Sequence, residues 1–123
     1  MNKTAQYFMS LAVLAALIGM IWGLHMAISK DHLMAPAHAH LNLLGWVSFA
    51  IFAFYYHLVP AAADSGLAKL HLGLAVVGLV LMIPGIALAI SRDFEPLAAI
   101  GSILSFLSMV TFGLVVLRHG LRR

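Results

Sequence analysis

Four long apolar stretches, separated by three short polar ones, make up most of the sequence. The apolar stretches cover residues 7–29, 37–59, 67–90 and 97–117. Each is long enough to cross a hydrocarbon layer about 30 Å thick as a helix, and lipid leaves a spanning backbone few options other than the helix. The pattern therefore predicts an all-α fold, in which residues 1–123 form a single integral membrane four-helix bundle.

The composition agrees with this pattern. Hydrophobic residues make up 63% of the 123 residues and charged residues only 9%, whereas a soluble domain has roughly 45–50% apolar and 25% charged residues. The chain has no cysteine, which excludes disulfides and thiolate metal ligands. The isoelectric point near 9.7 indicates membrane orientation rather than nucleic-acid binding, because the basic residues are scattered at the ends of the apolar stretches.

The charged residues also predict an orientation in the membrane. Four spans place both termini on one side, and positive charge marks the cytoplasmic side. The side of the termini carries Lys3, Lys69, Arg118, Arg122 and Arg123. The other side carries Lys30 and Arg92 beside Asp31, Asp93 and Glu95. We therefore expect cytoplasmic N- and C-termini and, in a bacterium, a multi-pass protein of the inner membrane.

Three of the seven histidines share one predicted depth. His25 lies near the outer end of the first span, and His38 and His40 lie one to two turns into the second span from its outer end. The other four lie in a connection, in the tail or nearer the inner side: His32, His119, His57 and His71. Ionisable groups at membrane depth are rare and are candidates for function. Three imidazoles on two adjacent helices form a candidate ligand set for haem iron or copper.

The two histidines of the H-x-H pattern are predicted to face apart. Residues two positions apart on a helix point about 200° apart, so His38 and His40 cannot bind one metal ion while the helix stays regular. They serve either two sites, or one site and one hydrogen bond. On the His38 side of the helix, Asn42 can hydrogen-bond a neighbouring helix or a ligand, and Gly45 leaves room for a bulky group against the backbone.

Residues 38–60 read HAHLNLLGWVSFAIFAFYYHLVP. This segment resembles a histidine-bearing helix of subunit I in the haem-copper oxidase and nitric oxide reductase superfamily, and the cbb3-type oxidases look closest. The shared pattern consists of His38, His40, Gly45, Trp46, Tyr56, His57 and Pro60. By position, the resemblance implies that His38 is the ligand of a high-spin haem and His40 the ligand of a low-spin haem.

The resemblance also implies an architecture. Subunit I of that superfamily has twelve helices, arranged as three four-helix units around a pseudo-threefold axis, and this chain has the length of one unit. It has neither the His-His pair nor the histidine-tyrosine pattern of the copper site in that family. The resemblance therefore implies haem binding, assigns no catalytic residue and leaves enzymatic activity open.

The expected function is that of a small membrane b-type cytochrome, in which haem b serves electron transfer or the binding of a diatomic gas. The candidate cofactor-binding residues are His25, His38, His40, Asn42, Gly45, Trp46 and Arg92, with the three histidines as the metal ligands. Arg92 and Lys30 lie at the level where haem propionates need cations. Two alternatives stay open: a non-haem protein that binds copper or zinc through His25 and one histidine of the second span, and an assembly partner without catalysis.

The H-x-H pattern also predicts an oligomer. A low-spin haem needs two imidazoles, and a single H-x-H helix leaves one histidine unmatched within one chain. A cyclic oligomer uses both, since His38 can face one neighbour and His40 the other. The three units of the resembled family favour a homotrimer with haem at each interface. Gly19 and Gly23, a small-xxx-small pair that permits close helix approach, are then expected to lie partly between subunits.

Overall fold

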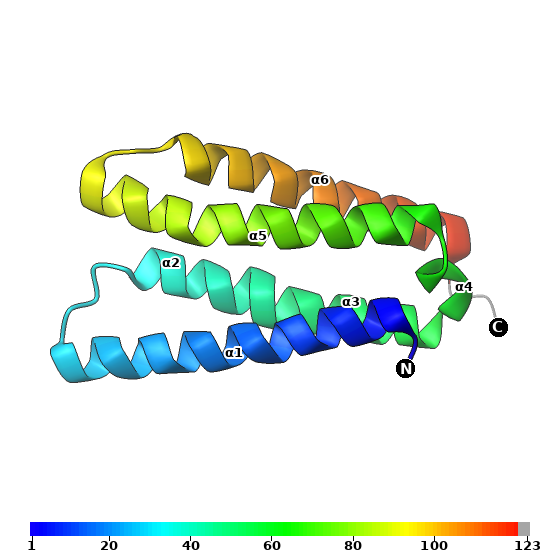
Figure 1. Ribbon diagram of the computed structural model, residues 1–123, viewed down its shortest axis with the longest axis horizontal. Coiled ribbons are helices and arrows are strands. Elements are labelled where there is room, and N and C mark those ends of the chain that lie inside the picture. The colour runs from blue at the N-terminus through cyan, green and yellow to red at the C-terminus, as the bar shows by residue number, and fades with distance from the viewer. Residues whose placement is uncertain (121–123) are drawn as a thin grey trace.

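The computed structural model describes residues 1–120 and contains two helical hairpins (Figure 1). The first hairpin joins α1 (Lys3–Ser29) to a second segment. That segment is built from α2 (Ala35–His40), the π-helix η1 (Leu41–Val47) and α3 (Ser48–Leu58). The three pieces follow one another as a single rod in Figure 1, so they act together as one spanning segment.

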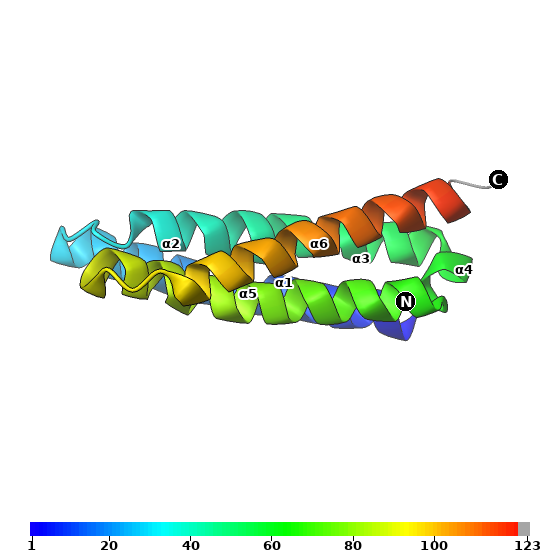
Figure 2. The same cartoon turned by 90° about the horizontal axis from the view of Figure 1, so that it is seen from above.

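The second hairpin completes the bundle. A short helix, α4 (Pro60–Ala63), leads from α3 into α5 (Gly66–Arg92), and α6 (Pro96–His119) returns alongside α5. The start of α1 and the end of α6 lie at the same end of the bundle (Figure 1). Figure 2 shows α6 crossing obliquely from the α5 side of the bundle toward the α3 side. The last turns of α6 therefore contact the first hairpin.

The predicted membrane spans are present. Within residues 1–120, four helical stretches are long and apolar enough to cross a membrane: Lys3–Ser29, Ala35–Leu58, Gly66–Arg92 and Pro96–His119. Their boundaries lie within a few residues of those expected from the apolar pattern. The prediction of an all-helical, multi-pass membrane protein is confirmed at this level, and the orientation of the termini stays a prediction.

Local sequence signals set several helix ends. The side chain of Asn2 accepts a hydrogen bond from the backbone N–H of Ala5 at 2.9 Å, which caps the start of α1. Ser65 caps α5 in the same way. Helices α1 and α5 are each followed directly by a residue in the left-handed conformation. These residues are Lys30, with φ of 58°, and Asp93, with φ of 52°. These turns make the two connections at the end opposite the termini short.

Glycines bring α5 and α6 into backbone contact. A Cβ atom added at Gly101 would lie 2.6 Å from the backbone nitrogen of Met82, and one added at Gly78 would lie 2.9 Å from that of Ser105. Small residues permit this approach, and van der Waals packing then holds helices that lipid does not press together. The buried face of α5 has alternating spacings of three and four residues: Ala68, His71, Ala75, Gly78, Met82 and Gly85.

An aromatic cluster fills the core in the half of the bundle near the termini. Phe8 of α1 packs edge-on against Phe49 and Phe52 of the second segment, with ring centroids 5.3 and 5.4 Å apart. The ring centroids of Phe112, on α6, and Phe52 lie 4.6 Å apart, so the cluster joins both hairpins. Each such aromatic pair contributes about 0.5–1.5 kcal/mol beyond the burial of its area.

A buried histidine belongs to this cluster. His71 of α5 is fully buried, and its Nδ1 lies 2.9 Å from the hydroxyl oxygen of Tyr56. Its ring meets that of Phe52 in a T-shaped arrangement with centroids 4.5 Å apart. Its Nε2 has no hydrogen-bond partner among the described residues. The Tyr56 hydroxyl is therefore the polar contact that allows an imidazole in an otherwise apolar core.

Gly101→Ala is expected to destabilise the bundle by about 1–3 kcal/mol, because the new methyl group would overlap the backbone of Met82. Thermal unfolding in detergent, followed by circular dichroism, measures the effect. Gly113→Ala is the control on the same helix, since within residues 1–120 its added Cβ would have no atom within 4 Å beyond the local backbone of the helix, and alanine favours the helix. Equal melting temperatures for the two variants would contradict the close α5–α6 contact.

Tyr56→Phe is expected to lower the free energy of unfolding by about 1–3 kcal/mol, because it leaves Nδ1 of His71 buried without a partner. Chemical unfolding in mixed micelles gives the value. Tyr7→Phe removes the same hydroxyl from a side chain that is 57% exposed and should change stability little. A Tyr56→Phe variant as stable as Tyr7→Phe would show that the buried hydrogen bond contributes nothing.

Candidate functional site

A π-helix follows the H-x-H pattern directly. In η1 the backbone bonds reach five residues back instead of four, and both the backbone N–H and the hydroxyl of Ser48 donate to the carbonyl of Leu43. Single π-helical turns inside α-helices occur frequently at functional sites. The structure differs here from the regular helix expected across residues 37–59. The H-x-H pattern itself lies in the regular α2, so the argument that its two histidines face apart still applies.

His38 is directed at α1. Its Nε2 lies 2.9 Å from the carbonyl oxygen of Gly19. Because a carbonyl can only accept, Nε2 carries the ring proton and donates it. The side-chain amide of Asn42 donates to the carbonyl of His38 at 2.9 Å and lies 3.1 Å from its Nε2. This small polar cluster ties the second segment to α1.

The two glycines of α1 make room for this cluster. A Cβ atom added at Gly19 would lie 2.5 Å from Oδ1 of Asn42, and one at Gly23 would lie 3.2 Å from Nε2 of His38. The predicted close approach at this small-xxx-small pair is therefore observed, but between two segments of the same chain. Asn42 and His38 cover these two positions within one chain, and a share of the pair in contacts between subunits stays a prediction.

His40 bonds a carbonyl of its own helix instead of one on α1. Its side chain is exposed, and its Nδ1 lies 2.7 Å from the carbonyl oxygen of Pro36, one turn earlier. It lines a groove of about 460 Å³ between the second segment and the second hairpin. The other residues lining the groove are Ala39, Leu43, Leu44, Met82, Ser102, Ser105, Phe106 and Met109. The contacts of His38 and His40 confirm that the two rings face different sides of the helix.

His25 lies apart from this pair. It is exposed on α1 and lines a shallow, mostly apolar recess with Ile18, Ile21 and Trp22. Within residues 1–120, no group of three or more His, Cys, Asp or Glu side chains is placed to hold a metal ion. The three histidines therefore do not converge on one ion within a single chain, as the opposed directions of His38 and His40 already implied. Their assignment as metal ligands stays a prediction.

The remaining candidate residues have separate places. Gly45 faces α1, and a Cβ atom there would lie 2.8 Å from the Cβ of Ala15. The room that its missing side chain leaves is thus taken by a neighbouring helix. Trp46 is 39% exposed on the outside of the second segment. Arg92 is exposed and is the last residue of α5. These three residues do not converge on the groove beside His40.

Sequence reasoning missed the importance of His71. The aromatic-His pattern at Tyr56 and His57 drew attention to His57, which is exposed, whereas Tyr56 bonds His71 of another helix. A usable signal was present: His71 lies on the buried stripe of α5, which is otherwise made of small residues and Met82. A histidine on such a stripe faces the core.

Comparisons with protein-family models, with curated proteins and with solved structures gave no match to this chain. The residues and their geometry are therefore the basis for assigning a function.

Proposed function

We propose that the chain is a membrane protein that binds haem b, with His40 as an axial ligand of the iron. The observation that supports this proposal is the hydrogen bond between Nδ1 of His40 and the carbonyl of Pro36. Because the carbonyl can only accept, Nδ1 carries the ring proton, and Nε2 of the neutral imidazole keeps its lone pair. Metal-ligating histidines are held in this way, with the second ring nitrogen donating to a carbonyl or carboxylate.

The groove beside His40 fits a large, mostly apolar ligand. Its volume of about 460 Å³ lies in the range of roughly 300–1,000 Å³ that is common for small-molecule sites. Leu43 and Phe106 supply apolar surface, and Met82 and Met109 supply polarisable thioethers. The groove opens to the outside of the bundle, so a bound porphyrin would lie between this chain and its lipid or protein neighbour.

His38 has a different role in this proposal. Its Nε2 donates to the carbonyl of Gly19, so it acts as an iron ligand only after it leaves that carbonyl. We therefore assign His38 to the packing of the second segment against α1, together with Asn42. Of the two histidines in the H-x-H pattern, His40 is therefore the one whose Nε2 can bind iron without any rearrangement.

In this proposal, a second imidazole for the iron would come from another copy of the chain. Among the described residues, His40 is the one histidine that lines its groove, and His25 is exposed on α1, at the same predicted depth. A head-to-tail ring in which His25 of one copy faces His40 of the next uses both residues at every interface. The three units of the resembled superfamily favour three copies.

When bound, the haem would supply reversible one-electron transfer or a binding site for a diatomic gas. The protein would supply the axial imidazole, a water-poor groove and, through Arg92 and Lys30 near the same membrane surface, positive charge for the propionates. The basic residues near the termini favour cytoplasmic termini, and in a bacterium this orientation would put the site in the outer half of the inner membrane.

Protein purified from haem-replete cells is expected to show a Soret band and, after reduction, sharp α and β bands. His40→Ala should lose most of this absorbance, because it removes the free coordinating nitrogen. His38→Ala should keep the absorbance per folded protein and lower the melting temperature instead, because it removes the bond to Gly19. Absorption spectra and melting curves of the same samples separate the two effects.

His32→Ala is the matched control, since His32 is an exposed residue of the α1–α2 connection and should leave the spectrum unchanged. A colourless wild-type protein with stoichiometric copper or zinc would replace the haem proposal by a non-haem metal site. A colourless and metal-free protein would leave the role of an assembly partner. A normal spectrum in folded His40→Ala would remove His40 as the ligand.

Native mass spectrometry in detergent is expected to show three chains and one haem per interface. His25→Ala should lower the haem content without unfolding the protein, because His25 is exposed and lies outside the core. A monomer that retains a full complement of haem would contradict the shared site, since the second ligand would then come from the same chain.

A further inference from the structure

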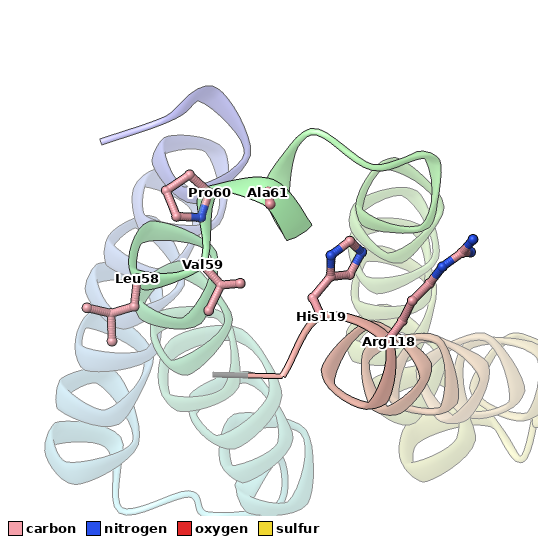
Figure 3. Close-up of a pocket in the computed structure, with 6 residues that line it drawn as sticks. All are labelled: Leu58, Val59, Pro60, Ala61, Arg118 and His119. Carbon is pink, nitrogen blue, oxygen red and sulfur yellow. The ribbon is translucent and has the colours of Figure 1, made fainter. Parts of the chain in front are cut away.

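A second cavity lies at the opposite end of the bundle from His40. It has a volume of about 210 Å³ and is lined by Leu58, Val59, Pro60, Ala61, Arg118 and His119. Figure 3 shows the turn from α3 into α4 on one side and the last residues of α6 on the other. The cavity thus lies between the two hairpins at the end of the bundle where α1 starts.

The two sides of this cavity differ in chemistry. Val59 and Pro60 supply an apolar side, whereas Figure 3 shows the side chain of Leu58 directed away from Arg118 and His119. Arg118 and His119 supply a side of nitrogen donors, and Figure 3 shows both side chains extending toward the start of α5. An apolar surface beside two basic groups, at the end of membrane-spanning helices, matches an amphipathic anion rather than a purely apolar or a purely polar ligand.

His119 carries a donor that the described residues do not use. Its Nε2 is shielded from solvent and has no hydrogen-bond partner in residues 1–120. Buried polar side-chain atoms nearly always have a partner. The nitrogen lies next to the cavity, so a ligand there can supply the acceptor that the described part of the chain does not.

The walls of the cavity are fixed by hydrogen bonds. The hydroxyl of Tyr55 donates to the carbonyl of Gly120 at 3.2 Å, and the N–H of Gly120 donates to the carbonyl of Val116 at 2.7 Å. On the opposite side, the side chain of Thr4 donates to the carbonyl of Ala63 at 2.9 Å. These bonds hold the end of α6 and the α4 turn in place.

The charges at this end favour an anion. Lys3 and Lys69 are exposed near the starts of α1 and α5, and Asp64 is the exposed acid after α4. Together with Arg118, the side chains of residues 1–120 at this end supply three cations against one carboxylate. Cations near a membrane surface attract anionic headgroups, and charge-assisted bonds to phosphate oxygens are strong.

We propose that this cavity binds the phosphate group of an anionic phospholipid, with Arg118 and His119 as donors and Val59 and Pro60 against the start of the acyl chains. The site is independent of haem binding. A bound lipid would fix the end of α6 relative to the α3–α4 turn. Without the lipid, α6 contacts α3 through the bond between Tyr55 and Gly120 and through the aromatic contacts of Phe112.

Native mass spectrometry with added phosphatidylglycerol or phosphatidylcholine of identical acyl chains tests the site. Wild-type protein is expected to retain phosphatidylglycerol roughly fivefold better, the size expected for one cation near an anionic surface. The double variant Arg118→Gln/His119→Gln should lose this preference. Lys69→Gln removes an exposed cation from the same end outside the cavity and should keep it. Circular dichroism verifies that each variant is folded.

Competing inorganic phosphate separates a lipid from a free ion. Retention of phosphatidylglycerol in excess phosphate supports the lipid, and displacement by phosphate overturns the lipid assignment in favour of a soluble anion. Equal retention of the two lipids by wild-type protein overturns the proposal without any variant. An equal loss of preference in Lys69→Gln and in the double variant also overturns it, because general positive charge would then explain the binding.

Discussion

Helices in lipid gain little from packing apolar side chains together, because the surrounding acyl chains are equally apolar. This constraint explains why the closest helix contacts in this protein involve glycine or a polar side chain. Gly101 brings α6 onto the backbone of Met82, and Gly19 leaves room for Asn42. His38 then bonds the carbonyl that Gly19 exposes. Because the many leucine and valine side chains pack equally well against lipid, these few contacts select one arrangement of the helices.

The same contacts divide the bundle along its length. Near the termini, Phe8, Phe52 and Phe112 join the hairpins around the buried His71. In the other half, His40 lies in a groove that opens to the outside. A functional side chain is positioned best when a rigid element supports it. In the proposed function, the aromatic half would provide that support, and His40 in the other half would bind the iron beside a neighbouring molecule.

Much of this architecture was predictable from the sequence, because hydropathy alone locates segments that must be helical in lipid. The opposed directions of His38 and His40 followed from helix geometry as well. The π-helix was not predictable, since it depends on how Ser48 meets the carbonyl of Leu43 and no residue type specifies it. The surroundings of Gly45 were missed for a related reason: a missing side chain accommodates a neighbouring helix as readily as a cofactor, and only the position of Ala15 decides between them.

The histidines show how little the residue type determines by itself. His38 and His40 belong to the same short helix, yet each meets a different backbone carbonyl. The carbonyl of Gly19 accepts a hydrogen bond from Nε2 of His38, whereas the carbonyl of Pro36 accepts one from Nδ1 of His40. In His38 the hydrogen bond engages Nε2, whereas in His40 it engages Nδ1 and leaves Nε2 free to bind a metal. The H-x-H pattern therefore combines a packing residue with a residue ready to act as a ligand, and the carbonyl that each ring meets decides which is which.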